Sequence, residues 1–461
     1  MASRRAPRRL RQRHAPPLRS AALRPTARAL PPRRTHHALR RARVRATGLH
    51  RARGARDRGA SAGETARRRE SLAVPLRNPL VEDVAIIGAG PAGSTLAALL
   101  AGRGISVALY DRDAFPRDKL CGEFLSYDAL PVLEPLGVVD EIDKAGAPRI
   151  ERCRVVGSKR TYEFAFPHAA RGVSRFYLDD LLHRVAQQRG ARAMVNTVNE
   201  LPEAKVIVGA WGRWGRFDQQ LGRKFVRDRS HRNFGFKRHY RRVEDRQSCL
   251  SGTGRIACPP PSNVIDLHSF KRGYLGVNAV EGGITNICGL VHASRLAHHK
   301  GKWDAFIETI RAEEPRLEEL YARHEPAQDG YLSSEPVIFR ARSAVEGGVF
   351  MIGDASGVID PLTGNGMAMA IQSALLLAPH IVRLLEQHAG RNEIENEYRR
   401  AHRKMFLARI AWSRRVASLL SRPRLLDTAL TTTSSPRIGE LLLRHTRASR
   451  DEIARLADAW F

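Results

Sequence analysis

Short apolar runs separated by a helical segment occur near the beginning of the patterned part of the chain. Residues 83–87 and 106–110 are apolar runs typical of strands buried in a parallel sheet. Residues 94–103 between them are small and mostly apolar, and Gly104 follows as a helix-ending residue. The pattern predicts a strand–helix–strand unit, and therefore an α/β fold.

The link between the first strand and the helix is the glycine-rich run of residues 88–93, Gly-Ala-Gly-Pro-Ala-Gly. Gly88 permits the tight turn, Gly90 lets a pyrophosphate approach the backbone, and Gly93 lets the helix pack closely on the strand. The pyrophosphate would lie at the positive end of the helix. Asp111 ends the second strand, where a carboxylate can accept hydrogen bonds from ribose hydroxyls. These features together predict dinucleotide binding.

A second glycine-rich strand-to-helix element lies far downstream. The predicted strand 349–352 is followed by Asp354, then by Gly364-Asn365-Gly366 and a predicted helix over 367–385. An acid just after a strand can accept hydrogen bonds from a ribityl chain. Bare N–H groups at a helix start can stabilise negative charge on the edge of a reduced flavin. Paired with the first motif, this element indicates a flavin site.

The chain resembles FAD-dependent oxidoreductases of the geranylgeranyl reductase type, within the larger group of aromatic-hydroxylase-like flavoproteins. The matching segments are residues 88–93, 111–123 and 353–366, and the most specific is Phe115-Pro116-Arg117-x-Lys119-x-Cys121-Gly122. The resemblance covers roughly residues 80 to 425. It implies FAD at the interface between a Rossmann-like domain and a substrate domain built on an antiparallel sheet.

The resemblance also assigns the cofactor contacts. It implies that Asp111 holds the adenosine ribose, Asp354 the ribityl chain, and residues 364–366 the isoalloxazine edge. Arg175, just before a predicted helix over 178–188, is carried over as a further contact. The expected FAD-binding residues are Gly88, Gly90, Ala92, Gly93, Asp111, Arg112, Lys119, Cys121, Gly122, Arg175, Gly353, Asp354, Pro361, Gly364, Asn365 and Gly366.

Two residues are candidates for catalysis. In such proteins the loop around Cys121 lies near the flavin ring, so Cys121 could donate a proton or gate the substrate channel. It could equally be the small buried residue that a free cysteine often is. Tyr274 lies where prenyl reductases often carry Tyr-x-Trp-x-Phe-Pro, but here the Trp and the Pro are missing. The Trp-x-Trp-x-Ile-Pro pattern of flavin halogenases does not occur in the sequence.

The chain departs from the family pattern at three places. Only about 15 residues separate Gly190 from the predicted strand 206–210, too few for the usual strand meander, so part of the cofactor domain is expected to be missing. The usual Gly-Ala-Asp-Gly has Trp211 in place of the acid, which weakens the expectation of a standard NAD(P)H route. Residues 241–262 have no clear period, as in a surface loop or a frameshifted patch of the gene.

Charge and cysteine usage narrow the function classes. Most of the formal net charge of +31 lies in residues 1–70, which hold 22 arginines, no lysine and three acids. Residues 1–75 cannot bury enough surface to fold alone. They are interpreted as a start codon assigned too far upstream, a transit peptide or a nucleic-acid-binding arm. Aromatic residues for base stacking are nearly absent, and no nucleic-acid function is expected. Five scattered cysteines without a C-x-x-C pair predict neither a metal site nor a disulfide framework, which fits a reducing compartment.

From residue 394 onward the pattern predicts helices with arginine-rich polar faces, with Pro423 ending one apolar stripe. One interpretation is a helix docked on the core with a solvated basic face. The other is a cationic amphipathic helix on an anionic membrane, which would suit a lipid substrate. No continuous apolar run of about 18 residues occurs, so no membrane span is expected. The expected location is cytoplasmic, with peripheral membrane contact left open, and the oligomeric state is not indicated.

The expected fold class is α/β: a Rossmann-like FAD-binding domain with an inserted antiparallel-sheet substrate domain and a helical C-terminal tail. The expected segments are 1–75 (disordered arginine-rich extension), 80–215 (first part of the FAD-binding domain, shortened), 216–335 (substrate domain), 336–390 (second part of the FAD-binding domain) and 391–461 (helical C-terminal region). The expected activity is reduction of carbon–carbon double bonds in a lipophilic, isoprenoid-like small molecule, with NAD(P)H as one candidate electron donor. Two alternatives stay open: a monooxygenase acting on a phenolic or polyketide-like ring, and a defective flavoprotein without activity.

Overall fold

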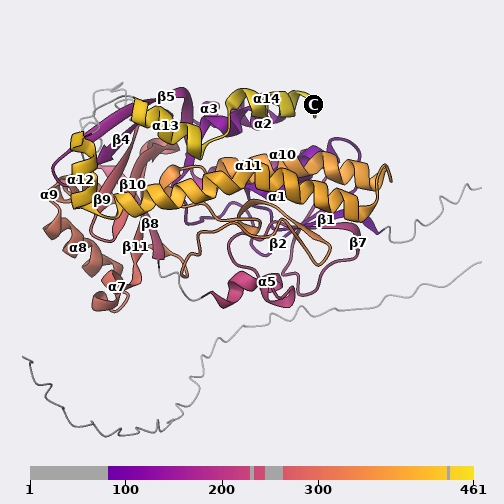
Figure 1. Cartoon of the computed structure of the whole chain (residues 1–461), viewed down its shortest axis with the longest axis horizontal. Coiled ribbons are helices and arrows are strands. Elements are labelled where there is room, and N and C mark those ends of the chain that lie inside the picture. Colours follow the sequence, from indigo (N-terminus) through magenta and orange to yellow (C-terminus); the bar gives the residue numbers. More distant parts are fainter. Residues whose placement is uncertain (1–80, 229–232, 244–262, 433–436) are drawn as a thin grey trace, which may run out of the picture. The chain divides into compact units, whose positions relative to one another are not determined.

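The computed structural model describes residues 81–228, 233–243, 263–432 and 437–461, which fold around two β-sheets (Figure 1). The predictions for residues 1–75 and for most of the segment 241–262 lie outside the described residues. The expected α/β class is confirmed, because one sheet is mainly parallel with helices packed on it.

The parallel sheet contains six strands in the order β14-β15-β7-β1-β2-β6, and only the β14–β15 pair is antiparallel. Its strands are β1 (Glu82–Ile87), β2 (Val107–Asp111), β6 (Arg192–Val195), β7 (Ala204–Gly209), β14 (Val345–Glu346) and β15 (Val349–Met351). The central strand β1 pairs with β2 and β7, so the glycine-rich loop after Ile87 lies at the carboxyl edge of the sheet. Ligands of open α/β sheets bind at this edge.

The helix α1 (Pro91–Ala101) is buried along its whole length, because its many small side chains let neighbours pack closely. It contacts both α4 (Arg175–Gln188) and α10 (Gly366–Leu385). Leu96, Leu99 and Leu100 of α1 belong to the main hydrophobic core. The two glycine-rich motifs are therefore brought together by the packing of the helices that follow them.

The short connection noted after Gly190 is real but does not interrupt the sheet. β6 is followed by β7 after residues 196–203 alone, with no strand meander between them in this part of the chain. β7 still pairs with β1 on one side and with β15 on the other. The parallel sheet therefore forms beside the first motif although the link between β6 and β7 is short.

The second sheet contains nine strands in the order β12-β8-β11-β10-β9-β4-β5-β3, with β13 paired to β8. Its strands are β3 (Phe124–Leu125), β4 (Arg149–Val156), β5 (Thr161–Gly172), β8 (Asn233–Arg242), β9 (Val264–Phe270), β10 (Gly273–Val280), β11 (Ile284–His292), β12 (His324–Pro326) and β13 (Leu332–Ser333). The predicted neighbours over 273–278 and 284–291 are confirmed as the antiparallel pair β10–β11.

Two expectations for this sheet need correction. The sheet is not built from residues 216–335 alone, because β3, β4 and β5 come from the stretch assigned to the FAD-binding domain. It is also not wholly antiparallel, because β4 and β9 form a parallel ladder from Arg152↔Val264 to Val156↔His268. The adjacent charged residues Glu151 and Arg152 interrupt the alternation by which β4 would be recognised as a strand from sequence.

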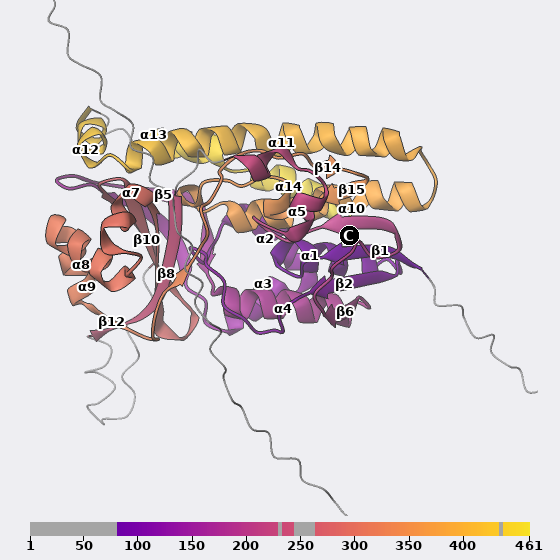
Figure 2. The same ribbon diagram turned by 90° about the horizontal axis from the view of Figure 1, so that it is seen from below.

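One face of the second sheet is covered by α8 (Trp303–Glu313) and α9 (Pro315–Ala322), with the short α7 (Ala293–Leu296) beside them (Figure 2). Phe306 and Ile310 of α8 pack against Phe236, Phe270 and Leu275 of the sheet. The opposite face carries the side chains that meet the loop 115–123 and the turn before α10.

The remaining α-helices come from the middle and the carboxyl-terminal parts of the chain. They are α2 (Leu130–Leu133), α3 (Val138–Lys144), α5 (Arg216–Gln220), α11 (Arg391–Leu420), α12 (Pro423–Thr432), α13 (Arg437–Thr446) and α14 (Arg450–Asp458). α11 lies against α10 and extends along the molecule toward α12, which begins at Pro423 (Figures 1 and 2). Its apolar side chains, such as Tyr398, Phe406 and Ile410, are buried, so α11 docks on the core. The membrane contact remains a prediction.

α10 is long and apolar enough to span a membrane by length and composition. Just over half of its most apolar stretch is buried inside the fold, where it packs on α1, as the central helix of a folded domain would.

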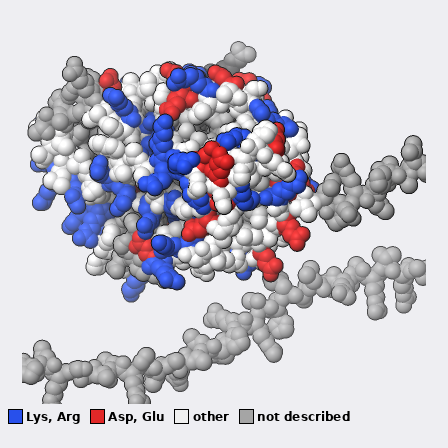
Figure 3. All heavy atoms as spheres, turned by 45° about the vertical axis from the view of Figure 1, so that its right-hand side comes forward, with Lys and Arg blue, Asp and Glu red and all other residues white. Residues whose placement is uncertain are grey.

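Basic side chains cover more of the surface seen in Figure 3 than acidic ones do.

Candidate functional site

The loop between β1 and α1 forms a backbone cradle in which the three glycines play different parts. Gly88 has a φ of +109°, and a Cβ there would lie 2.3 Å from the carbonyl oxygen of Ala210. A Cβ at Gly93 would lie 1.8 Å from the carbonyl oxygen of Gly88. At Gly90 the nearest atom to a Cβ is a guanidinium nitrogen of Arg175, 3.7 Å away. Gly88 and Gly93 therefore serve packing, while Gly90 leaves an open approach to the α1 N-terminus.

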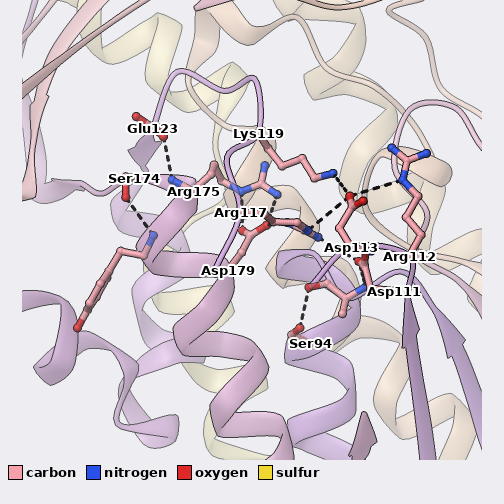
Figure 4. A network of polar contacts seen from close by, with 12 residues as sticks. Ser94, Asp111, Arg112, Asp113, Arg117, Lys119, Glu123, Ser174, Arg175 and Asp179 are labelled. Atoms are coloured by element: carbon pink, nitrogen blue, oxygen red, sulfur yellow. Dashed lines mark hydrogen bonds and ion pairs between the residues drawn. The ribbon is translucent and has the colours of Figure 1, made fainter. Parts of the chain in front are cut away.

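A network of charged side chains surrounds this cradle (Figure 4). Asp111 accepts hydrogen bonds from the backbone N–H of Ala89 at 2.8 Å and from Arg117 at 3.0 Å. Arg117 also donates to Asp179 at 2.7 Å. Arg175 donates two further hydrogen bonds to Asp179, at 2.6 and 2.7 Å. The fully buried Asp179 thus fixes two guanidinium groups beside the glycine loop.

Two of the predicted FAD contacts, Arg112 and Lys119, lie on the outer side of this network. Lys119 pairs with Asp113 at 2.7 Å, and Arg112 approaches the same carboxylate at 3.5 Å while its side chain is 72% exposed. The hydrogen bond from Lys119 holds the pKa of Asp113 below its ordinary value, although partial burial opposes this. Contact of Arg112 and Lys119 with FAD stays a prediction.

The second motif lies directly against the first. Gly353 has a φ of +59°, and a Cβ there would come within 3.0 Å of the Ala92 Cβ. Asp354 follows, and burial raises the pKa of its carboxyl, while nearby Arg213 and Arg342 oppose the rise. Among the described residues none donates a hydrogen bond to this carboxylate. Asp354 is therefore free to accept from a ligand beside the glycine loop.

The turn before α10 is oriented by a buried carboxylate that the sequence did not reveal. Asp128 accepts hydrogen bonds from the side-chain amides of Asn365 and Gln372, at 3.2 and 3.0 Å, and from the backbone N–H of Ala448 at 3.1 Å. Asn365 is fully buried, and its Oδ1 has no partner. Gly364 takes a left-handed φ of +61° just before it. Asp128 thus fixes the residues expected at the isoalloxazine edge.

The loop 115–123 ends in a second buried ionic cluster. Glu123 accepts from the Lys237 ammonium at 2.5 Å and from the backbone N–H of Arg175 at 2.9 Å, and it contacts the His239 ring at 2.7 Å. Burial raises the pKa of Glu123, but the hydrogen bonds and charges of His239 and Lys237 outweigh it and leave that pKa below its ordinary value. The cluster links β8 to the start of α4, and because Glu123 belongs to the loop 115–123, it also holds the end of that loop in place.

The two predicted catalytic residues have different hydrogen-bond partners. Cys121 lies in the held loop, where its carbonyl oxygen accepts from Asn286 at 3.3 Å and Gly122 follows with open space around it. Tyr274 instead donates its hydroxyl hydrogen to Asp360 at 2.5 Å. Burial and the neighbouring Asp360 raise the pKa of Tyr274 well above its ordinary value. Burial likewise raises the pKa of Asp360 to about 6. Catalytic roles for Cys121 and Tyr274 stay predictions.

Two cavities lie on either side of the turn that contains Pro361 and Gly364. The larger, of about 1210 Å³, is open and is bordered by Tyr274, Asp360 and Arg414. The smaller, of about 80 Å³, is mostly apolar and reaches Gly364. Its walls come from the second sheet, from α11 and from α13, and its lining residues are Phe124, Cys153, Val155, Phe164, Phe166, Ile265, Leu267, Leu362, Thr363, Gly364, Val416, Leu420, Leu442, Leu443, Thr446 and Arg447.

Trp211, which stands where the family resemblance predicts an acid, has a structural role in this chain. Its indole N–H donates to Asp218 at 3.1 Å, and its ring fills the space beside Gly209 and Gly215. Asp218 also pairs with the fully buried Arg223 at 2.8 Å. An acid is thus present seven residues later, but it anchors the chain and does not face the glycine loop.

These features fit an FAD molecule. Gly90 leaves room for a pyrophosphate, and the half-buried carboxylate of Asp354 accepts no hydrogen bond from a described residue. Asn365 Oδ1 and two nitrogens of Arg342 are buried polar atoms without partners. Such atoms are costly to bury unless a ligand satisfies them. Gly366 opens α10, so the positive end of this helix adjoins the same space.

Sequence reasoning missed several residues that hold the site. Asp179 lies four residues after Arg175 on one helix, a spacing that could have indicated the ion pair. Glu123 directly follows the recognised Cys-Gly pair, but nothing pointed to its partners on β8. Asp128 had no detectable signal, because its donors are distant in sequence.

Two family models match parts of the chain. A model described as an FAD binding domain matches residues 82–204, and a model described as squalene epoxidase matches residues 328–412. These ranges contain the two glycine-rich motifs.

Curated relatives include a menaquinone reductase of Mycolicibacterium smegmatis, 28% identical over 75% of this chain and 86% of that protein. A 1H-pyrrole-2-carbonyl-[peptidyl-carrier protein] brominase of Pseudoalteromonas luteoviolacea is 26% identical over 66% of this chain and 78% of that protein.

Among solved structures, the flavin-dependent brominase Bmp2 matches with a TM-score of 0.64 and 20% identity, over 82% of this chain and 93% of that one. The myxobacterial chondrochloren halogenase CndH matches with a TM-score of 0.62 and 20% identity, over 83% and 97%. At this identity the structural likeness shows the shared fold. None of the matches described here names geranylgeranyl reductase.

Proposed function

Because the chain is an FAD-dependent oxidoreductase, we propose that it reduces a carbon–carbon double bond in a lipophilic small molecule. The observation that carries this proposal is the apolar cavity that reaches Gly364, beside the turn that fits the flavin edge. Aromatic and aliphatic side chains line it, and no acidic residue does. A menaquinone reductase among the relatives, which acts on a lipid-soluble quinone, supports the same substrate class.

The residues of this chain would bind and orient the reactants. The α1 N-terminus at Gly90 would take the pyrophosphate, and Asp354 would accept from the ribityl hydroxyls. Asp128 would hold Asn365 and the start of α10 against the ring edge. When bound, FAD supplies the hydride, and a proton must reach the adjoining carbon. Leu267 and the other sheet side chains would exclude water from the reacting carbon.

The presence of brominases among the relatives makes oxygen-dependent chemistry the competing class. No Trp-x-Trp-x-Ile-Pro pattern occurs in the sequence, which favours reduction over halogenation. The electron donor is left open. Trp211 does not offer the acid that relatives use, so NAD(P)H is tested as one donor beside a chemical reductant.

The test uses FAD-loaded protein reduced anaerobically, in parallel samples, with NAD(P)H or with dithionite, and then mixed with a short-chain menaquinone. We expect the flavin absorbance to return without oxygen and the product to keep two added hydrogens after exposure to air. Reduction of the quinone ring alone would give a quinol that returns to the starting mass in air. A product that forms only with oxygen and carries an added oxygen or halogen atom would refute the proposal.

A variant that fills the cavity tests where the substrate lies. Val416→Phe adds a ring inside the small cavity, whereas Leu419→Phe adds one on the outer side of the same helix. We expect Val416→Phe to slow substrate-dependent flavin reoxidation at least tenfold while FAD retention is unchanged. Leu419→Phe serves as the control. Equal rates for both variants would place the substrate elsewhere.

A further inference from the structure

Arg447 is a buried arginine whose charge is not neutralised within the described part of the chain. Its residue is 8% exposed, and it lies on the wall of the small apolar cavity. Its Nε has no hydrogen-bond partner, and its one side-chain hydrogen bond is a long one of 3.4 Å to the neutral hydroxyl of Thr446. Burying a charge in this way is unfavourable unless a partner arrives.

The three other arginines of the described residues that are, like Arg447, no more than 8% exposed each have a close polar partner. Arg171 pairs with Asp143, and Arg223 pairs with Asp218. Arg409 donates to the side-chain carbonyl of Gln372 at 2.7 Å. Arg447 therefore stands apart from the way this fold normally satisfies a buried guanidinium.

Three aromatic rings surround the Arg447 guanidinium. Its carbon lies 5.7 Å from the ring centre of Phe124, 5.8 Å from that of Tyr127 and 5.3 Å from that of Phe166. Ring faces stabilise a cation moderately and restrict its movement. They do not supply the in-plane acceptor that the N–H groups of a guanidinium require. The rings thus hold the charge in place and leave its donors available.

We infer that Arg447 binds an oxygen atom of the substrate that carries full or partial negative charge, while the rest of the substrate occupies the apolar cavity. The substrate class is therefore an apolar ring or chain bearing one carboxylate, phenolate or conjugated carbonyl oxygen. An all-hydrocarbon isoprenoid would leave Arg447 unsatisfied. This inference rests on the proposed function for the reaction, but the binding role of Arg447 can be measured without turnover.

The position of Arg447 suits a role in specificity. Gly364 and Thr363 line the same cavity, so a ligand held by Arg447 lies next to the turn expected at the flavin edge. A site built to pair with a substrate oxygen rejects an analogue that lacks it, because the buried partner is then left unpaired.

The experiment measures binding of benzoate and of benzyl alcohol to the full-length, FAD-loaded, oxidised protein by calorimetry and by flavin difference spectra. The two probes share a ring and differ in charge. We expect benzoate to bind at least tenfold more tightly than benzyl alcohol. Arg447→Met should remove this preference by weakening benzoate alone, and Arg447→Lys should keep part of it. Arg444→Met, which changes an exposed arginine on α13, should leave both affinities unchanged.

Thermal melting separates a binding role from a structural one. If Arg447 serves a ligand, Arg447→Met should not lower the Tm of the ligand-free protein, and benzoate should raise the Tm of the unmodified protein and of Arg444→Met but not that of Arg447→Met. The inference is overturned if benzoate shows no saturable binding or no preference over benzyl alcohol. It is also overturned if Arg447→Met retains the preference, or lowers the Tm without weakening benzoate.

The outcomes distinguish this inference from the proposed function. Loss of the anaerobic, hydrogen-retaining product while the Arg447-dependent benzoate preference persists would refute the reductase and leave the anion-binding role in place. Anaerobic reduction of menaquinone without any preference for benzoate would support the reductase and refute the anion-binding role of Arg447.

Discussion

Replacement of Gly90 by alanine should separate folding from FAD binding. Gly90 has φ −73° and ψ −172°, an extended conformation that alanine adopts without strain. The nearest atom to the added methyl is an Arg175 nitrogen at 3.7 Å, an ordinary contact. The methyl would nonetheless stand at the α1 N-terminus, where we expect the pyrophosphate. Gly90→Ala should therefore fold normally and bind FAD poorly.

The magnitudes can be worked from the local structure. Loss of a glycine at a helix N-cap costs roughly 0.5–1 kcal/mol, and the reduced entropy of the unfolded chain returns about 0.4–1 kcal/mol. The free energy of unfolding of the apoprotein should thus change by less than about 1 kcal/mol. Displacing a phosphate from one backbone donor removes a hydrogen bond to a charged group worth about 1.5–3 kcal/mol. FAD affinity should then fall on the order of 10- to 100-fold.

Gly390→Ala is the matched control. Gly390 is also an N-cap glycine, with φ −66° and ψ 147°, and no atom lies within 4 Å of a Cβ there. Both variants should show the same apoprotein stability in urea unfolding, and only Gly90→Ala should lose flavin fluorescence quenching on titration with FAD. Gly93→Ala, whose Cβ would collide with backbone at 1.8 Å, should fail to fold. Wild-type FAD affinity in Gly90→Ala would refute the assignment of this loop.

Three further substitutions test the charged groups around the site. Asp179→Asn should cost about 3–5 kcal/mol of unfolding free energy in urea, because Arg175 and Arg117 lose a buried partner. Asp128→Ala should cost about 2–5 kcal/mol by the same measurement and shift the flavin spectrum, because three buried donors lose their acceptor. Asp360 has a folded-state pKa raised to about 6, so its contribution to stability declines as pH rises from about 4 to about 6. Asp360→Asn should remove up to about 3 kcal/mol of this pH dependence.

Each of these expectations has a result that would contradict it. Asp140→Asn, at an exposed position on α3, is the control for loss of a carboxylate. Asp179→Asn no less stable than this control would mean that the two arginines find other partners. An unchanged flavin spectrum in Asp128→Ala would mean that the turn before α10 does not face the ring. For Asp360→Asn, a stability–pH curve parallel to the wild-type curve would mean that the carboxyl is already ionised near pH 5.

The sequence was most informative where structure and ligand impose local rules. The glycines of residues 88–93 and Asp111 were found because a tight turn, a close approach and an acid must follow a strand in fixed order. The α10 start and the β10–β11 pair were found for similar local reasons. Asp128 and Arg447 could not be found from the sequence. The hydrogen-bond donors of Asp128 lie hundreds of residues away, and Arg447 is notable only because its Nε has no partner in the folded structure.

The structure shows how the fold accommodates the departures from the family pattern. The short link between β6 and β7 contains no strand, and the parallel sheet forms because β7 pairs directly with β1. The sequence has Trp211 at the position where an acid was expected. In the structure the indole N–H of Trp211 donates a hydrogen bond to Asp218. β4 was not recognised, because its partner β9 lies beyond the segment without a clear period.

The hydrogen bond from Ala448 to Asp128 joins residues 320 positions apart and closes the site from the carboxyl-terminal side. During synthesis, the ribosome must therefore deliver nearly all of this chain before the apolar cavity gains its last wall. A nascent chain halted near residue 440 would display Phe124, Phe166 and Leu267 uncovered. Chaperones that recognise apolar surface would then compete with FAD for the nascent chain, and flavin supply would limit the yield of folded holoprotein.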